Sequence, residues 1–141
     1  MKRTVMSLKP ILLGLIILIF TSCNTNNQNE ELPMLYGKWI WVQSSGGIDG
    51  STITPKENEP VKILRFVKPD KIESYIGDSL ISSRSFKLKK DLSIYSADSL
   101  YFIIDGTSSF PKAIFRLTEN TLSLADNFYD GFSELYHRID E

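Results

Sequence analysis

The sequence predicts an all-β fold, a single small antiparallel β-barrel of about eight strands in up-and-down order. Three observations lead to this prediction. Beyond the N-terminal segment, no ten-residue window shows apolar residues at helical spacing. Short segments that favour β-structure are separated by turns rich in Gly, Pro, Asn and Asp. These segments follow one another as hairpins without βαβ spacing, and closure into a barrel removes exposed sheet edges.

Eight segments are predicted as strands. A Gly/Ser-rich segment, 44–60, is expected to be the longest connection, and the Pro69-Asp70 turn follows the second strand. Phe86 and Leu88 share one face of their strand, which is the period-two pattern of a strand half exposed to water. The predicted strands are 38–43, 61–67, 72–76, 79–89, 100–104, 113–117, 121–125 and 132–139.

The N-terminal 22 residues are expected to be a signal peptide. Three basic residues precede or flank an apolar run at 11–20, which is shorter than a bilayer-spanning helix. The run ends in Phe20-Thr21-Ser22-Cys23, which resembles a bacterial lipobox with Phe in place of the usual Leu. The resemblance implies that Cys23 is lipidated and becomes the N-terminus. The alternative is an uncleaved membrane anchor with an incidental cysteine.

The lipidated form predicts both a location and a boundary. Residues 23–35 are expected to be a flexible tether, because from Cys23 onward they are rich in Asn and acids and poor in apolar residues. The barrel domain is then expected over 36–141. We expect a bacterial cell-envelope protein held to the membrane through Cys23, with the outer membrane as its expected location. Which face it occupies, periplasmic or surface, is left open.

Charge and cysteine content narrow the function classes. Loss of Lys2, Arg3 and Lys9 with the signal peptide leaves 13 basic against 17 acidic residues, a net charge of −4 with His137 neutral. A mildly acidic domain with scattered basic residues argues against nucleic acid as a partner. Because Cys23 is the single cysteine, a hydrophobic core rather than a disulfide must hold the fold.

Four short motifs resemble the lipocalin-like domains of bacterial lipoproteins. In that superfamily the Trp of the first motif closes one end of the barrel against an Arg of the last strand. The resemblance therefore implies a cation–π contact between Trp39 and Arg138. The motifs are Gly37-x-Trp39, Leu64-x-Phe66 running into the Pro69-Asp70 turn, Leu122-x-Leu124 and Tyr136-x-Arg138.

The last predicted strand carries the candidate binding residues. Phe132, Glu134, Tyr136 and Arg138 share one face at period two. If this face points inward, Glu134, Tyr136 and Arg138 are buried polar groups that require partners, and an interior Arg with a Tyr suits a ligand carboxylate. Alternatively, Arg138 caps the barrel over Trp39 and pairs with Glu134. We favour the cap, because Arg138 lies close to the end of the chain.

Apolar side chains on the predicted strands are candidates for a ligand-binding lumen. An eight-stranded barrel is just wide enough to be filled by its own side chains or to hold one small ligand. Composition does not separate these two outcomes. The side chains expected to line the lumen are Trp41, Leu64, Phe66, Phe86, Phe115, Leu122 and Leu124.

Catalytic and metal chemistry find little support. His137 is the single histidine and is expected to face outward, opposite Tyr136, so a general base there is disfavoured. One histidine and a lipidated cysteine do not make a zinc site. The acids near Asp126 and Asp130 lack the spacing of a calcium loop and suit turns. We therefore predict no enzyme activity, no metal and no cofactor.

The expected function is binding without catalysis. The predicted protein is a lipid-anchored, lipocalin-like barrel that holds a small hydrophobic or amphipathic molecule in its lumen. The alternative is a filled barrel that acts as a protein-interaction module, as an accessory subunit or inhibitor of an envelope enzyme. A connected apolar cavity under 44–60 distinguishes the two.

Overall fold

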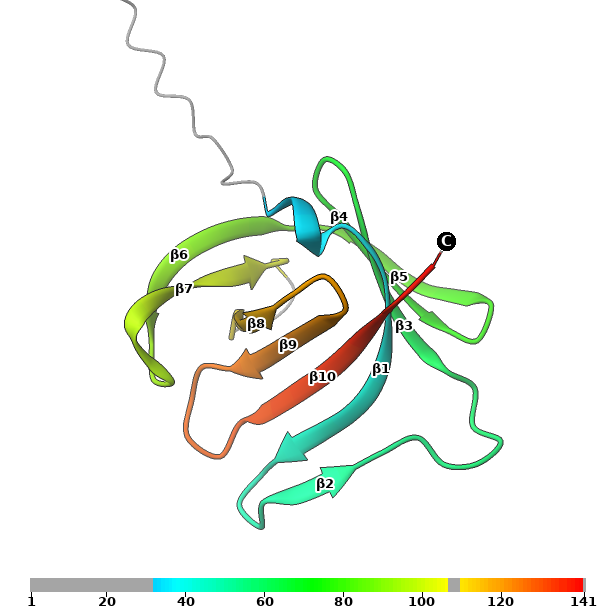
Figure 1. Ribbon diagram of the computed structural model, residues 1–141, viewed down its shortest axis with the longest axis horizontal. Helices are drawn as coiled ribbons and strands as arrows, with labels where there is room; N and C mark the ends of the chain where they lie inside the picture. Colours follow the sequence, from blue (N-terminus) through cyan, green and yellow to red (C-terminus); the bar gives the residue numbers. More distant parts are fainter. Residues whose placement is uncertain (1–31, 107–109, 141) are drawn as a thin grey trace, which may run out of the picture.

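The computed structural model describes residues 32–106 and 110–140, and these form one antiparallel β-sheet with a single short helix (Figure 1). Cys23 and the predicted signal peptide lie outside the described residues. The elements are η1 (Pro33–Leu35), β1 (Gly37–Gly46), β2 (Ser51–Ile53), β3 (Lys62–Val67), β4 (Lys71–Ile76), β5 (Ser79–Ser85), β6 (Lys87–Ser93), β7 (Ser96–Ile104), β8 (Lys112–Leu117), β9 (Thr121–Asp126) and β10 (Phe132–Ile139).

The all-β, up-and-down architecture is confirmed. The strand order is β5-β4-β3-β1-β10-β9-β8-β7-β6, and β2 pairs with the end of β1. Every ladder between neighbours is antiparallel, as expected for strands joined by hairpins. The first and last long strands, β1 and β10, lie side by side in the middle of this order, with Trp39 opposite Arg138.

The number of strands and the closure differ from the prediction. The sheet has ten strands rather than eight, and within the described residues no ladder joins its two edge strands, β5 and β6. Segment 79–89, predicted as one strand, is divided at Phe86, whose backbone N–H donates to the carbonyl of Asp70 (2.7 Å). The short β2 forms within the predicted 44–60 loop because Ser51–Ile53 pairs back onto β1.

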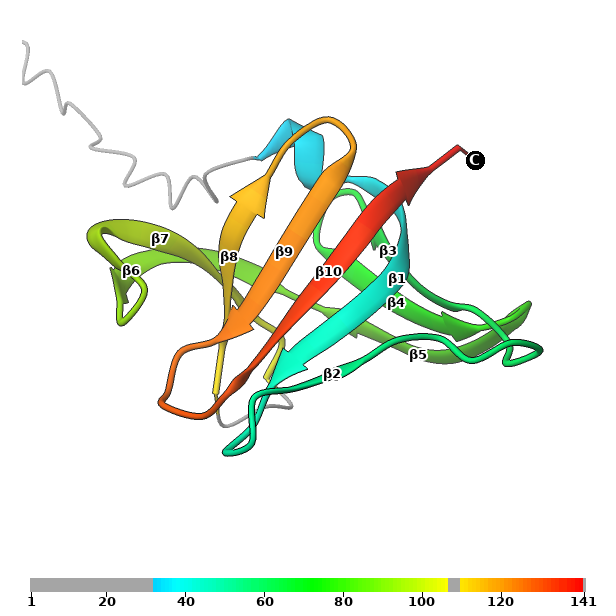
Figure 2. The same cartoon turned by 60° about the horizontal axis from the view of Figure 1, so that its bottom comes forward.

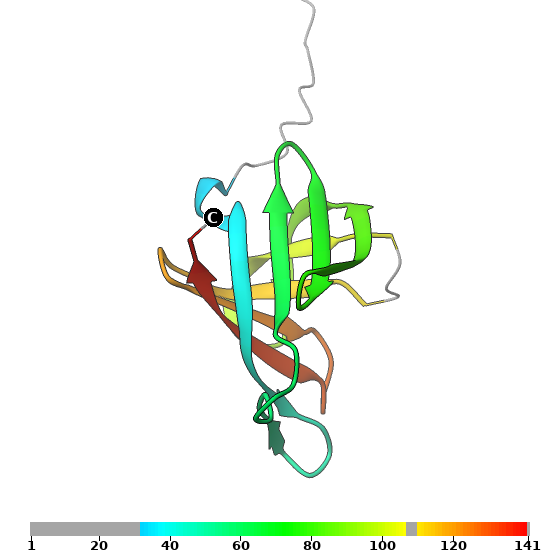
Figure 3. The same ribbon diagram turned by 90° about the vertical axis from the view of Figure 1, so that its right-hand side faces the viewer.

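The sheet is strongly curled, and its two halves face each other across an interior (Figures 2 and 3). The two edges stay close where the chain passes from β5 to β6. There the Arg84 guanidinium of β5 lies 3.2 Å from the carboxylate of Asp105, which follows β7. This ion pair therefore links the edge strand β5 to the end of β7 without a backbone ladder.

The hydrophobic core begins earlier than the predicted domain boundary. Leu35 is fully buried and Leu32 packs against the core, so the C-terminal end of the predicted 23–35 tether belongs to the fold. All the core residues lie between Leu35 and Tyr136, so a soluble form comprising residues 24–141 retains every one of them. They are Leu35, Trp39, Trp41, Phe66, Ile72, Phe86, Ile103, Ile114, Leu122, Leu124 and Tyr136.

One predicted lumen residue lies on the outside of the sheet. Phe115 is 48% exposed and packs edge-on against Tyr95, with ring centroids 5.8 Å apart. The pairing of β8 with β9 shifts register between Ile114 and Arg116, so the strict alternation assumed for 113–117 breaks there. A bulge turns the following side chains to the other face, which explains why the prediction for Phe115 was wrong.

Candidate functional site

A cavity of about 370 Å³ lies inside the curled sheet. Its volume falls within the range of about 300–1,000 Å³ that is typical of small-molecule sites. The apolar part of its lining comes mainly from β1, β3, β4 and β5 and from the strands opposite them. These apolar residues are Trp41, Ile63, Leu64, Ile72, Ile76, Ile81, Ile103, Phe110 and Leu124.

Polar side chains complete the lining and include charges of both signs. The exposed lining residues Lys62, Ile76, Ile81 and Phe110 mark where the cavity meets solvent. Of the predicted 44–60 loop, Ser44 alone contributes to the lining. The polar lining residues are Ser44, Lys62, Ser74, Tyr75, Arg84, Asp105, Lys112, Glu134 and Tyr136.

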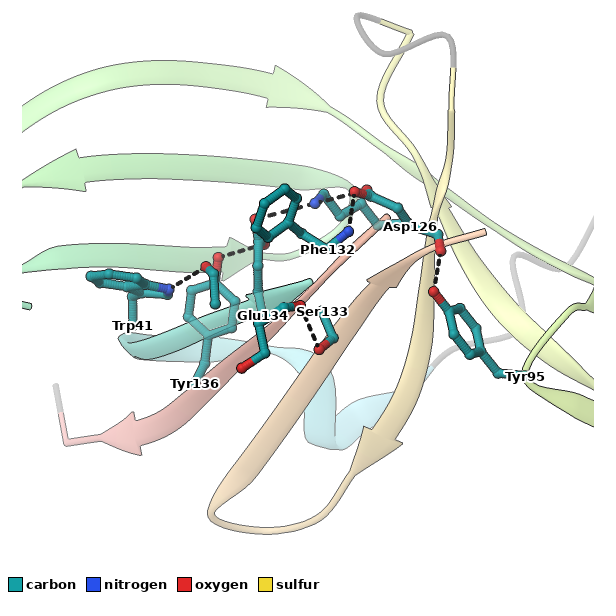
Figure 4. A network of polar contacts seen from close by, with 10 residues as sticks. Trp41, Tyr95, Asp126, Phe132, Ser133, Glu134 and Tyr136 are labelled. Carbon is teal, nitrogen blue, oxygen red and sulfur yellow. Dashed lines mark hydrogen bonds and ion pairs between the residues drawn. The ribbon is translucent and has the colours of Figure 1, made fainter. Parts of the chain in front are cut away.

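A network of charges occupies the β8–β10 wall (Figure 4). The Lys112 ammonium lies 3.0 Å from an Asp126 carboxylate oxygen and 3.1 Å from Glu134 Oε1. The Tyr136 hydroxyl donates to Glu134 Oε2 (2.9 Å). The second oxygen of Asp126 accepts the backbone N–H of Phe132 (3.0 Å). The ammonium of Lys112 therefore forms ion pairs with the carboxylates of Asp126 and Glu134.

The network keeps Lys112 charged and Tyr136 neutral. Burial alone would lower the pKa of Lys112, but Glu134 and Asp126 outweigh it through charge and hydrogen bonds, so the pKa is raised above 10.5. Burial, together with the charge and hydrogen bond of Glu134, raises the pKa of Tyr136 far above its ordinary value. Lys112 is thus an ammonium rather than a nucleophilic amine, and Tyr136 is a hydrogen-bond donor.

Two further polar pairs border the cavity. The Trp41 indole N–H donates to the Ser44 hydroxyl oxygen (2.9 Å), and the Lys62 ammonium lies 4.5 Å from the centre of the Trp41 ring. Arg84 pairs with Asp105, and its Nε is buried with no hydrogen-bond partner in the described structure. A basic and an acidic residue therefore face each other at the β5 side of the cavity.

Five of the predicted site residues meet at this cavity, and the rest of the described ones do not. Trp41, Leu64, Leu124, Glu134 and Tyr136 line it. Phe66, Phe86 and Leu122 are buried in the core but are not among the lining residues, and Phe66 and Phe86 stack edge to face with centroids 5.4 Å apart. Phe115 faces outward, and Cys23 lies outside the described residues.

Trp39 and Arg138 lie away from the cavity. The guanidinium carbon of Arg138 is 4.1 Å from the centre of the Trp39 ring, so the contact implied by the family resemblance is present. Trp39 is fully buried, and its indole N–H donates to the carbonyl of Leu35 (2.8 Å). The predicted pairing of Arg138 with Glu134 is wrong, because Glu134 is paired with Lys112 and Tyr136.

Arg138 is instead bound by backbone carbonyls. It donates to the carbonyls of Tyr36 (2.8 Å), Glu119 (2.5 Å) and Met34. Gly37 leaves room for it, since a Cβ at this position would lie 2.5 Å from Arg138 Nη1 and the backbone has a φ of +125°. Gly37-x-Trp39 therefore packs against Arg138, which joins the start and end of the folded chain.

Sequence reasoning missed Arg84, Asp105 and Lys112 as cavity residues. Arg84 has the same strand parity as Phe86, which was expected to face inward, and this signal was available in the sequence. Lys112 and Ile114 are likewise two residues apart on one strand, so the two side chains are expected on the same face, and Ile114 is buried. Asp105 was treated only as the end of a strand before Gly106, and nothing in the sequence indicated its pairing with Arg84.

The described residues offer no metal site. Within 32–106 and 110–140, no group of three or more His, Cys, Asp or Glu side chains is placed to hold an ion. His137 is exposed.

No helix in the described part of the chain is long and apolar enough to cross a membrane. The arrangement of the site suits binding of a small molecule through an apolar wall and a few polar groups.

No family model matches the chain, and no curated protein or solved structure shows significant similarity to it. We therefore infer its function from the cavity and from the sequence features alone.

Proposed function

We propose that this protein is a lipid-anchored, lipocalin-like carrier or binding protein of the bacterial cell envelope. It holds a small hydrophobic or amphipathic molecule in the cavity and performs no chemistry on it. The cavity is the observation that carries this proposal, because a barrel filled by its own side chains would leave no such volume.

The lining supports a ligand with an apolar body. Trp41 of β1, Leu64 of β3 and Leu124 of β9 contribute apolar surface from both halves of the sheet. Each methylene group that leaves water for such a wall contributes about 0.8 kcal/mol. A molecule of several carbons enclosed here would therefore bind without any charged contact.

The proposed location in the cell envelope rests on the sequence. The lipobox-like Phe20-Thr21-Ser22-Cys23 and the polar segment after it support a lipid-anchored tether for the domain. The contact of Trp39 with Arg138 and the curl of the sheet support a lipocalin-like relationship. In that relationship β5 and β6, which no ladder joins, correspond to the edge strands of an incompletely closed barrel.

A second candidate is the protein-interaction module. Ile48, between β1 and β2, is 94% exposed, and Tyr129, between β9 and β10, is 85% exposed. The two turns lie at the same end of the molecule (Figure 1), and Gly46 pairs with Phe132 beside them. This end would present apolar side chains to an envelope protein.

Titration with an uncharged fluorescent apolar probe, N-phenyl-1-naphthylamine, tests the carrier proposal on residues 24–141. We expect saturable one-to-one binding that Leu64→Trp weakens about tenfold or more, because the larger side chain fills the cavity. Leu80→Trp is the matched control, since Leu80 is exposed and does not line the cavity. Absence of binding, or equal loss in both variants, contradicts the proposal and favours the interaction module.

A further inference from the structure

Apart from Lys62, the charged side chains that line the cavity lie in contact with opposite charges. Arg84 lies 3.2 Å from Asp105, and Lys112 lies between Glu134 and Asp126. Lys62 stands apart from these pairs, since it is exposed at the solvent side and its ammonium covers the Trp41 ring. The enclosed part of the cavity therefore carries no excess of positive charge with which to hold an anion.

In the enclosed part of the cavity, away from Lys62, a charged ligand would meet a like charge. A carboxylate beside Arg84 would also face Asp105, and one beside Lys112 would also face Glu134. An ammonium would meet Arg84 and Lys112 in the same way. Because repulsion and desolvation both cost more in a partly enclosed site than in water, each kind of ion binds weakly there.

Neutral polar groups remain for a ligand to use. Ser74 of β4 lines the cavity, and its hydroxyl group donates and accepts hydrogen bonds. The Ser44 hydroxyl oxygen accepts from Trp41, so its own proton is left to donate. These hydroxyl groups match an alcohol, an amide or an ester oxygen, which likewise carries no net charge.

We infer that the natural ligand is an uncharged amphipath, with a neutral oxygen-bearing end bound by the serine hydroxyls and an apolar body against Trp41 and Leu64. This inference rests on the proposed carrier function and deepens it by naming the ligand class. The cavity volume of about 370 Å³ lies near the small end of the range of about 300–1,000 Å³ for ligand sites, so the ligand is a small molecule.

The test compares 1-decanol, decanoate and decylamine, which share a chain and differ in the charge of the head group. Binding to residues 24–141 is measured calorimetrically at neutral pH. We expect 1-decanol to bind about tenfold or more tightly than either ion. Tighter binding of decanoate than of 1-decanol would overturn the inference.

Variants that remove one carboxylate show whether the ion pairs themselves exclude a charged ligand, or whether any ion binds weakly because it loses its hydration. Asp105→Asn leaves Arg84 without its carboxylate partner, so the ratio of decanoate to 1-decanol affinity should rise about tenfold. Glu134→Gln removes a carboxylate from the other wall and should raise the same ratio, which provides a second test if Asp105→Asn does not fold. Asp98→Asn is the control, since Asp98 is exposed and does not line the cavity.

The possible results distinguish the inference of an uncharged ligand from the proposal that the protein is a carrier. If the three probes bind but the ratio stays the same in both charge variants, charge pairing does not set the ligand class and the inference fails, while the carrier proposal stands. If none of the three probes binds while N-phenyl-1-naphthylamine does, the inference fails and the carrier proposal stands; if the naphthylamine does not bind either, both fail.

Discussion

Replacing Arg138 by Met is expected to lower the free energy of unfolding by about 3 kcal/mol. The guanidinium donates to the carbonyls of Met34, Tyr36 and Glu119 and covers the ring of Trp39. A hydrogen bond to a charged group contributes about 1.5–3 kcal/mol, and water replaces part of the loss at the exposed carbonyls. Urea unfolding of residues 24–141 measures the change.

The matched control is Arg116→Met, since Arg116 is exposed on β8. We expect this control to change stability by no more than about 0.5 kcal/mol. Binding of the naphthylamine probe should be unaffected by Arg138→Met, because Arg138 does not line the cavity. Unchanged stability with a selective loss of acidic ligands would instead identify Arg138 as a ligand group.

Replacing Lys112 by Met is expected to cost about 3 kcal/mol at neutral pH. The ammonium lies between Glu134 and Asp126, and its removal leaves two partly buried carboxylates without their shared cation. Breaking such an arrangement typically costs about 3–5 kcal/mol, and the partial exposure of these groups places the estimate at the lower end. Lys87→Met, at an exposed lysine of β6, is the control.

The pH dependence of this difference follows from the raised pKa of Lys112. A lysine with a raised pKa contributes stability that is fully present below its ordinary value of 10.5 and is lost as the pH rises through the raised value. The gap in stability between the native chain and Lys112→Met should therefore be constant from neutral pH to about pH 10 and narrow above it. If the stability difference widens as the pH rises, or is absent at neutral pH, charged Lys112 does not stabilise the fold through Glu134 and Asp126.

Alternation along strands predicted much of the site. It placed Glu134 and Tyr136 of the last strand on one face, and both line the cavity. It failed at Phe115, where a bulge in β8 shifts the register, and it did not show that the predicted strand 79–89 divides at Phe86, although Phe86 itself is buried. Single-strand periodicity contains no information about a bulge or a bend, because both depend on the pairing with neighbouring strands.

The ion pairs of the cavity were the main feature that the sequence did not predict. Arg84 of β5 and Asp105, which follows β7, are brought together by the curl of the sheet. Lys112 and Glu134 are separated by 22 residues and meet because β8, β9 and β10 are neighbours. Such pairs follow from the sheet order, whereas the contact between Trp39 and Arg138 was available from the family resemblance.

The most direct test of the carrier proposal is a crystal structure of residues 24–141 with N-phenyl-1-naphthylamine bound. We predict electron density for the probe in the cavity, in contact with Trp41, Leu64 and Leu124. Density confined to the outer surface, or an empty cavity at saturating probe concentration, would contradict it.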